Sequence, residues 1–360
     1  MERKNEKSEI GEEPSTINLP RVIFGTSGLG NLFVAHDEES KCKIIKECIR
    51  LANGIVVFDS AGKYGAGLAL EVLGNCLKKL NISQDQVVIS NKLAWVRTEL
   101  KTAEPTFEPG VWKDLKHDAV QKISYQGMME CFEQGNELLG GYTPQLVSVH
   151  DPDEYMALAK NKSQADKLYE DVLDAYRALY DLKKQGRVKA IGVGAKDWKI
   201  IRRIAKDVSL DWVMIANSMT IIEHPAELLD FMTLLDKKGV SIINAAVFNA
   251  GFLVGGDYFN YKLVKPGTPE NDALFRWRSE FFKVCKSFEV KPAAACIQFS
   301  LHAPGVDSIA LSTTDVSRIK ENIMFANTEL PGAFWETLKA KGFISVNFFE
   351  THPAVTEKKQ

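Results

Sequence analysis

Four side chains that can exchange protons stand at or just after the ends of three successive apolar segments. Asp59 follows the apolar run 54–58, and Tyr64 lies five residues further along. Lys92 ends the next apolar run, and His150 ends the third. A phenol has an ordinary pKa of about 10, so a tyrosine that exchanges a proton near neutral pH needs a neighbouring cation to stabilise its phenolate. These residue types together predict one acid–base site.

The strands that carry these residues explain why they are expected to meet. The run Gly54-Ile55-Val56-Val57-Phe58 is too short for a helix and is typical of a strand buried on both faces. In parallel α/β proteins the loops after the strands converge at one end of the sheet, where active sites are built. Asp59, Lys92 and His150 occupy such strand ends. Taken singly, each has an ordinary structural explanation, and the combination favours catalysis.

Strand and helix patterns alternate along nearly the whole chain. The segments 41–52, 68–80 and 166–184 repeat apolar residues at helical spacing. A strand followed by a helix, repeated about eight times, predicts an α/β fold of the (β/α)₈ TIM barrel type. The predicted strands are 21–26, 55–59, 87–92, 146–150, 189–194, 212–217, 240–247 and 307–312.

Composition indicates an ordinary soluble, cytoplasmic protein and gives no support for a nucleic acid or membrane partner. Hydrophobic residues make up 45% of the chain and charged residues 26%, with a net charge of −2, so there is no basic excess for a nucleic acid or an anionic membrane. No apolar run approaches the roughly 20 residues that span a bilayer. The six cysteines lack metal-ligand spacing, which favours reduced core thiols and predicts no metal site. Oligomeric state is not predicted.

A chain of 360 residues is long enough for one α/β barrel. Residues 1–17 are rich in Lys, Glu and Ser and lack the apolar stretch of a signal peptide, so we expect a flexible polar tail. Residues 18–345 are predicted to form the single barrel domain, and residues 346–360 a C-terminal tail.

In order and strand context, Asp59, Tyr64, Lys92 and His150 resemble the catalytic tetrad of the aldo-keto reductases. Shorter matches run from Phe24 to Asn322, and the resemblance extends from about residue 20 to about residue 345. It implies a nicotinamide cofactor. It also implies that the tyrosine exchanges the proton, that the lysine and the aspartate stabilise its phenolate, and that the histidine orients the substrate oxygen.

Two long connections depart from the minimal barrel repeat. They follow the third and the seventh predicted strands, at 95–117 and from 248 to about 271, and both are rich in aromatic residues. Long loops in compact domains are usually functional or disordered, and aromatic residues are uncommon in disorder. We expect both connections to border the active site, as in the family, with Trp95 and Trp112 contacting the substrate.

The segment 308–315 leads from the last predicted strand into a helix whose start carries several hydroxyl groups. A helix N-terminus of this kind can bind an anion, although simple capping of the helix explains it equally well. The resemblance places the adenosine end of the cofactor here. NADPH-preferring relatives usually carry a lysine at the position of Ser312, so its absence and the nearby Asp315 favour NAD over NADP, although Arg318 can still grip a phosphate. The residues that the resemblance assigns to the cofactor are Gly25, Thr26, Asn217, Phe248, Asn249, Gly251, Leu253, Ser312, Thr313, Arg318, Glu321 and Asn322.

The cofactor segments also differ from those of the better-known reductases. Alanines replace the usual tyrosine and serine at 245–246, which leaves Phe248 as a candidate to stack on the nicotinamide, and Gly194-Ala195 replaces the usual Ser-Asn pair. With the segment 247–253, these departures resemble the aldose 1-dehydrogenase branch, which includes L-fucose, D-threo-aldose and L-galactose dehydrogenases.

The leading hypothesis is oxidation of the C1 hydroxyl of a cyclic sugar, of the L-fucose, L-galactose or D-arabinose type, to a lactone with NAD or NADP. The alternatives are a pyridoxal 4-dehydrogenase, a general NADPH-dependent carbonyl reductase and, from another class, a nucleotide-binding regulatory subunit.

Overall fold

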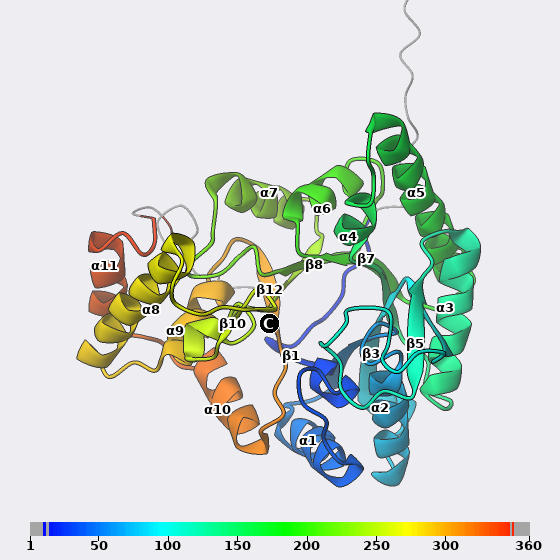
Figure 1. The fold of residues 1–360 in the computed structure, drawn as a ribbon, viewed down its shortest axis with the longest axis horizontal. Helices are drawn as coiled ribbons and strands as arrows, with labels where there is room; N and C mark the ends of the chain where they lie inside the picture. Colours follow the sequence, from blue (N-terminus) through cyan, green and yellow to red (C-terminus); the bar gives the residue numbers. More distant parts are fainter. Residues whose placement is uncertain (1–9, 12–13, 346–347, 349–360) are drawn as a thin grey trace, which may run out of the picture.

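A computed structural model describes residues 10–11, 14–345 and 348 (Figure 1). Eight parallel strands close into a barrel, and helices surround it. The (β/α)₈ barrel predicted from the sequence is therefore confirmed, and each predicted strand overlaps an observed one. In barrel order, the strands are β1 (Val22–Gly25), β2 (Val56–Ala61), β3 (Val87–Leu93), β6 (Leu146–His150), β7 (Ala190–Ala195), β8 (Trp212–Ala216), β9 (Ser241–Ala245) and β12 (Val306–Leu311).

Most of the helices lie between successive strands, and several begin directly after a residue whose side chain caps them. The helix predicted at 41–52 begins earlier, at Glu38, because the Asp37 carboxylate accepts a hydrogen bond from the Ser40 backbone. The helix predicted at 166–184 begins at Lys162 for the same reason, with Asn161 as its cap. The α-helices are α1 (Glu38–Leu51), α2 (Leu68–Lys79), α3 (Tyr125–Leu138), α4 (Pro152–Met156), α5 (Lys162–Lys184), α6 (Trp198–Ile204), α7 (Ala226–Lys237), α8 (Pro269–Ser287), α9 (Pro292–Leu301), α10 (Val316–Ala326) and α11 (Gly332–Ala340), and the 3₁₀ helices are η1 (Ser27–Gly30), η2 (Gln84–Gln86) and η3 (Phe252–Val254).

Two hydrophobic clusters hold the barrel together. The larger cluster packs the outer faces of the strands against the helices, and Phe58, Ile89 and Val149 belong to it. The smaller cluster fills the barrel interior and includes Trp212, which is fully buried. Both faces of the strands are thus covered, which explains why β2 begins with three consecutive apolar residues, Val56, Val57 and Phe58, and lacks the alternation of a half-exposed strand.

The register of neighbouring strands sets the positions of the polar residues along the barrel axis. Asp59 on β2 pairs with Ser90 on β3, and Lys92 lies two residues further along β3. On the next strand, β6, Ser148 pairs with Lys92, and His150 follows at the strand end. These side chains therefore share the carboxyl end of the barrel, where the following loops converge.

The two long connections contain small sheets of their own. The first, expected as a loop over 95–117, forms an antiparallel hairpin of β4 (Trp95–Glu99) and β5 (His117–Gln121), because its ends pair from Trp95 with Gln121 to Glu99 with His117. Its middle remains irregular. The second contains η3 and the short pair β10 (Tyr258–Phe259) and β11 (Lys262–Leu263).

Parts of the expected terminal tails lie against the barrel. The Ile10 backbone exchanges hydrogen bonds with residues 207 and 209, both at 2.9 Å, and the Ser15 backbone donates to the Asp211 carboxylate at 2.6 Å. At the other end, Phe348 is buried and stacks on Phe299 with 4.3 Å between the ring centres. The rest of the two predicted tails, namely 1–9, 12–13, 346–347 and 349–360, falls outside the described residues.

All six cysteines are free thiols, and Cys42 alone among them is not fully buried. Among the described residues, no helix is long and apolar enough to cross a bilayer. Over the same residues, no cluster of three His, Cys, Asp or Glu side chains is arranged to hold a metal ion.

Candidate active site

A buried ion pair joins the carboxyl ends of β2 and β3. Lys92 Nζ contacts the Asp59 carboxylate and also donates to the Ser60 carbonyl at 3.2 Å, while Ser90 Oγ donates to Asp59 Oδ1 at 3.2 Å. The exposed fractions of Asp59 and Lys92 are 3% and 2%. Charges this deep are tolerated only when they are paired and hydrogen-bonded, so each partner fixes the position of the other.

Tyr64 and His150 complete a compact group around this pair. Lys92 Nζ lies 4.7 Å from the centre of the Tyr64 ring, and the His150 ring meets the Tyr64 ring edge-on with 5.7 Å between centres. Burial, together with the Asp59 carboxylate, raises the pKa of the Tyr64 phenol well above its ordinary value. Burial lowers the pKa of His150, so its imidazole is neutral at physiological pH. The structure thus brings together a phenol, a lysine cation and a neutral imidazole, which can exchange a proton with a bound oxygen and orient it.

A close approach of two backbone segments fixes the Tyr64 loop. Gly30 in η1 lies against Tyr64, and a Cβ atom added at Gly30 would stand 2.7 Å from the Tyr64 carbonyl carbon. Gly65 makes the reciprocal contact, because a Cβ atom there would stand 2.3 Å from the Gly30 carbonyl oxygen. Only glycines permit these backbones to pack at this distance.

A Gly30→Ala variant is therefore expected to displace Tyr64 and to lower kcat by about 10- to 100-fold, since small displacements of reacting groups are costly in rate. Steady-state kinetics with any accepted substrate measures the loss. The matched control is Gly332→Ala, because Gly332 has ordinary backbone angles and nothing within 4 Å of an added Cβ atom. An alanine at Gly30 that leaves kcat unchanged would show that the close approach does not place Tyr64.

Aromatic side chains of the first long connection line one side of Tyr64. The Trp112 ring lies 5.9 Å from the Tyr64 ring, and Trp112 Nε1 donates to Glu108 Oε2 at 2.7 Å. Phe107 contacts both predicted substrate residues, with ring-centre distances of 5.7 Å to Trp95 and 6.4 Å to Trp112. Both tryptophans therefore belong to the aromatic group beside Tyr64.

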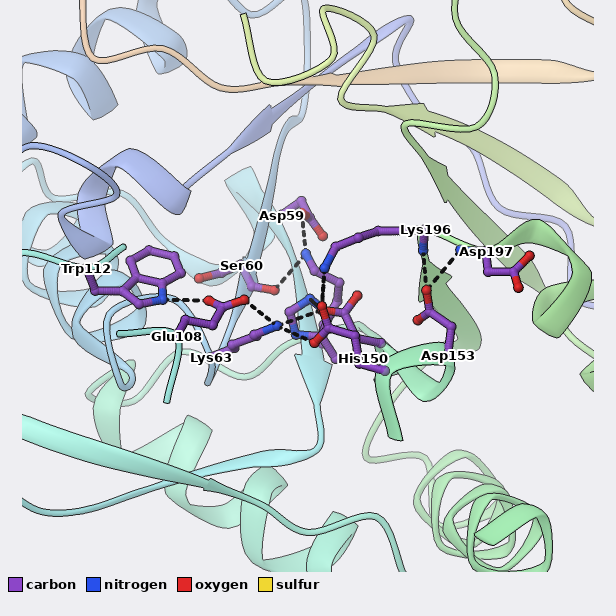
Figure 2. Close-up of polar contacts among 12 residues, drawn as sticks. Asp59, Ser60, Lys63, Glu108, Trp112, His150, Asp153, Lys196 and Asp197 are labelled. Carbon is purple, nitrogen blue, oxygen red and sulfur yellow. Dashed lines mark hydrogen bonds and ion pairs between the residues drawn. The ribbon is translucent and has the colours of Figure 1, made fainter. Parts of the chain in front are cut away.

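A second group of charges, which the sequence analysis missed, borders the four predicted residues. Lys63 Nζ lies 2.9 Å from the Asp151 carboxylate, 2.9 Å from Glu108 and 2.7 Å from Glu154, while Lys196 Nζ contacts Glu154 and lies 3.6 Å from Asp151. Figure 2 shows Trp112, Glu108 and Lys63 joined in a row beside His150, with Lys196 on the far side. We call Lys63, Glu108, Asp151, Glu154 and Lys196 the ion cluster.

Two neighbourhoods in the sequence carried a signal for this cluster. Lys63 immediately precedes Tyr64, and Asp151 immediately follows His150, so both are charged residues inside buried turns of the site. Burial alone would lower the pKa of Lys63, but the carboxylates of Asp151 and Glu108 raise it above its ordinary value. Burial alone would raise the pKa of Asp151, but the Lys63 and Lys196 cations hold it well below its usual range. Both groups are therefore charged at neutral pH.

Both long connections reach this region. Glu108 and Trp112 come from the first, and Tyr261 comes from the second, where the centre of its ring lies 5.8 Å from Lys196 Nζ. The backbones of Glu108 and Tyr261 have positive φ angles of 45° and 67°, which are uncommon for residues other than glycine. Such backbone geometry clusters at functional sites because surrounding contacts must hold it.

The predicted cofactor residues near the ends of the chain surround the junction of β1 and β12. Thr26 Oγ1 donates to the Asp59 carbonyl at 3.1 Å and to Ser60 Oγ at 2.8 Å, which places Gly25 and Thr26 beside the tetrad. Ser27 Oγ donates to Ser312 Oγ at 3.2 Å across the junction. Thr313 follows, and α10 then begins with Asp315 as its cap and carries Arg318, Glu321 and Asn322.

A second set of predicted cofactor residues follows β8 and β9. Asn217 and Asn249 are buried, have positive φ angles of 62° and 46°, and have side-chain carbonyl oxygens without a hydrogen-bond partner among the described residues. The Asn249 amide nitrogen donates to Asn260 at 2.8 Å. Two buried, unpaired acceptors fit a ligand that brings N–H donors, such as a carboxamide. Phe248 and Gly251 lie in the turn that leads into η3, and Leu253 lies within η3.

Comparison with known proteins decides which family has this barrel and this site. The family described as the aldo/keto reductase family matches residues 21–342. The chain belongs to this family. The resemblance predicted from the tetrad and the shorter motifs is thus confirmed, and the reductase is an oxidoreductase that uses a nicotinamide cofactor, as members of the family do.

Two curated relatives cover nearly the whole reductase. Pyridoxal 4-dehydrogenase from Microbacterium luteolum is 26% identical over 351 residues, which cover 95% of this chain and 99% of that protein. D-threo-aldose 1-dehydrogenase from a Pseudomonas species is 26% identical over 332 residues, which cover 89% of this chain and 93% of that protein. Both relatives are consistent with the branch predicted from the sequence.

A solved structure supports the fold of the reductase. An aldo-keto reductase from Bacillus halodurans, determined in its holo form, aligns with a TM-score of 0.65 and 16% sequence identity. The alignment covers 95% of this chain and 98% of that protein. Because the identity is low, this likeness bears on the barrel and not on the substrate.

Proposed function

We propose that the reductase oxidises the C1 hydroxyl of a cyclic aldose to the lactone by transferring a hydride to a nicotinamide cofactor. The observation that carries this proposal is the ion cluster beside Tyr64, together with the Trp112 ring. Charged groups that surround an aromatic ring suit a substrate with many hydroxyl groups and an apolar C–H face, whereas a pocket for simple aldehydes is mostly apolar. The similarity to D-threo-aldose 1-dehydrogenase supports the same substrate class.

The four residues of the tetrad divide the proton chemistry among them. The Tyr64 phenolate removes the proton of the C1 hydroxyl, and the Lys92 cation, 4.7 Å from the Tyr64 ring centre, stabilises that phenolate. Asp59 holds Lys92 in place through the buried ion pair. His150 donates a hydrogen bond to the substrate oxygen. A bound nicotinamide cofactor would supply the acceptor for the hydride that leaves C1, and this would balance the loss of two electrons from the sugar.

The residues present fit such a cofactor. Asn217 offers a buried, unpaired carbonyl oxygen that would accept a hydrogen bond from the carboxamide, and Phe248, which packs against the hydrophobic core, would contact the nicotinamide ring. The turn that contains Asn249 and Gly251, together with Leu253 in η3, would cover the pyrophosphate, and Gly25 and Thr26 at the end of β1 would border the nicotinamide ring. The adenosine end would lie on the start of α10, against Ser312, Thr313, Arg318, Glu321 and Asn322.

We propose that NAD is preferred over NADP. Ser312 carries no charge, and the Arg318 guanidinium is already paired with the Asp315 carboxylate at 3.3 Å. Glu321 is likewise paired, with Lys291. A 2′-phosphate at this helix start would meet the Asp315 carboxylate and would have to compete for Arg318, whereas a free 2′-hydroxyl would not.

The test is formation of reduced nicotinamide by the purified protein with NAD⁺ and NADP⁺ in parallel, against L-fucose, L-galactose, D-arabinose and pyridoxal. We expect turnover of at least one sugar, with higher kcat/KM for NAD⁺ than for NADP⁺. No turnover of any sugar, combined with NADPH-dependent reduction of simple aldehydes, would refute the sugar assignment. A higher kcat/KM with NADP⁺ would refute the cofactor assignment alone.

Pyridoxal is the second candidate substrate, because the relative that acts on it matches 95% of this chain. Its hemiacetal carries a C–H and an O–H on one carbon, so the same four residues would perform the same oxidation. The assay above separates the two candidates directly: a pyridoxal dehydrogenase would turn over pyridoxal and none of the sugars.

A further inference from the structure

Asp151 occupies an unusual position at the end of β6, directly after His150. Its backbone is left-handed, with φ 49° and ψ 51°, a conformation that aspartate tolerates better than most residues. Its backbone N–H donates to the Gly194 carbonyl at 2.8 Å, so the neighbouring strand β7 holds the turn. The direction of the Asp151 side chain is therefore set by the barrel and does not depend on a free loop.

Three nitrogens surround one oxygen of the Asp151 carboxylate. Oδ2 accepts a hydrogen bond from Lys63 Nζ at 2.9 Å, and it lies 3.6 Å from Lys196 Nζ and 3.7 Å from His150 Nε2. Lys63 comes from the turn after β2 and Lys196 from the turn after β7, so the two lysines hold the carboxylate from different elements. His150 thus faces a fixed negative charge at its Nε2 side.

The two nitrogens of His150 have different surroundings. A neutral imidazole carries one proton, so one nitrogen donates and the other accepts. Nδ1 is buried and has no hydrogen-bond partner among the described residues, so a proton there would be an unsatisfied donor. The Asp151 carboxylate favours a proton on Nε2, on electrostatic grounds. A proton on Nε2 also makes this nitrogen the donor that a substrate oxygen requires.

We propose that Asp151 is a positioning residue that keeps the His150 proton on Nε2 and so sets the hydrogen bond by which His150 orients the substrate oxygen. This inference rests on the proposed role of His150, and it adds to the tetrad a residue that acts through it. Lys63 and Lys196 contribute to this role of Asp151, because they fix the position of its carboxylate and balance its charge.

The charges around His150 explain why both lysines are needed. The groups that face it are Asp151, Lys63, Lys196 and Lys92, with the Tyr64 ring at its edge. An unbalanced carboxylate beside a buried imidazole would favour the doubly protonated, charged ring. The three lysines oppose that effect and, with burial, hold the pKa of His150 below its ordinary value. The imidazole thus stays neutral while the carboxylate still selects the nitrogen that carries its proton.

Glu154 provides a matched control within the same cluster. Its carboxylate contacts both Lys63 and Lys196, as that of Asp151 does, but no contact joins it to His150 or Tyr64 among the described residues. Its side chain is 37% exposed. Asp151→Asn and Glu154→Gln therefore each neutralise one carboxylate that contacts the same two lysines. Only Asp151→Asn removes the negative charge beside His150 Nε2.

The first experiment reads the tautomer without any turnover. Nitrogen-15 NMR of protein labelled in its six histidines reports which ring nitrogen carries the proton, and the signal missing from a His150→Gln variant assigns His150. We expect the Nε2–H form in the native protein and in Glu154→Gln, and a mixture with the Nδ1–H form in Asp151→Asn. An unchanged His150 signal in folded Asp151→Asn would overturn the proposal.

The second experiment is a double-mutant cycle on the rate. Asp151→Asn is expected to lower kcat by about 10- to 100-fold, as loss of a carboxylate that orients a catalytic histidine does elsewhere. In a His150→Gln background, Asp151→Asn should change kcat by no more than about 3-fold. An equal loss in both backgrounds would show that Asp151 does not act through His150. If His150→Gln alone keeps full activity, the proposed role of His150 fails, and the NMR result still reports on Asp151.

Discussion

Replacement of Tyr64 by phenylalanine is expected to lower kcat by about 10²- to 10⁴-fold and to leave nucleotide affinity unchanged. The change removes one oxygen and keeps the ring, which contacts Trp112 at 5.9 Å and His150 at 5.7 Å between ring centres. Packing is thereby preserved, and the proton donor and acceptor is lost. Single-turnover measurement of hydride transfer, with a fluorescence titration of the nucleotide, separates the two effects.

The pH dependence offers a second test of the same residue. Burial raises the pKa of Tyr64, so the residue is mostly the protonated phenol at neutral pH, and the phenolate that oxidation needs becomes more abundant only as pH rises above neutrality. The rate of oxidation by the native protein is therefore expected to increase with pH above neutrality, and the reverse reduction, which needs the protonated phenol, is not. The residual rate of Tyr64→Phe should lack this increase.

Tyr125 provides the matched control for Tyr64. Its hydroxyl donates to Asp181 at 2.7 Å between α3 and α5, on the outside of the barrel, so Tyr125→Phe makes the same chemical change outside the site. We expect its kcat within about 2-fold of the native value. A Tyr64→Phe protein that retained a comparable rate would remove Tyr64 from the proposed mechanism.

Replacement of Lys92 by methionine is expected to reduce both stability and turnover. The substitution leaves the Asp59 carboxylate buried without its partner, which typically costs about 3–5 kcal/mol in the free energy of unfolding. It also removes the cation beside Tyr64, and we expect kcat to fall by about 10²-fold or more. Urea unfolding measures the first effect, and steady-state kinetics measures the second.

A double variant separates these two consequences. In Lys92→Met with Asp59→Asn, no charge remains unpaired, so most of the lost stability should return, because neutral replacements of buried ion pairs are often tolerated. Turnover should not return, because the phenolate still lacks its cation. Recovery of kcat together with stability would contradict the proposed role of Lys92.

Lys183 serves as the control for Lys92. It forms another ion pair with a buried carboxylate, that of Asp211, at 2.7 Å, where α5 packs near β7 and β8. Asp211 also accepts hydrogen bonds from the backbone of Ile191 at 2.8 Å, so this pair holds the barrel and not the site. Lys183→Met is therefore expected to lower the free energy of unfolding while kcat at 25 °C stays close to the native value.

The elements of the barrel could be predicted from the sequence because their causes are local. Within the predicted run 54–58, Val56, Val57 and Phe58 are apolar and buried, as a strand covered on both faces requires, whereas Ile55 precedes the strand and is exposed. The helix predicted over 166–184 follows from its own apolar spacing, and its earlier start at Lys162 reflects the Asn161 cap, which was not predicted. The tetrad positions followed, since residues at the carboxyl ends of neighbouring parallel strands must share one face of the barrel. Their catalytic roles stay predictions that Tyr64→Phe and Lys92→Met test.

The contacts that complete the site depend on residues far apart in the chain. Lys63 meets Asp151 across 88 positions, and Lys63 also meets Glu108 from a connection whose hairpin was not predicted. Neither contact follows from spacing, because the register of three strands and the path of a loop with positive φ at Glu108 decide them. The unpaired acceptors of Asn217 and Asn249 likewise become visible only once burial is known. The sequence by itself determined the barrel and which strand ends carry acid–base groups, because the periodicity of apolar residues reflects neighbours that are close in the chain. Only the tertiary structure decided which charges surround those groups, because these ion pairs form between distant segments when the whole barrel closes.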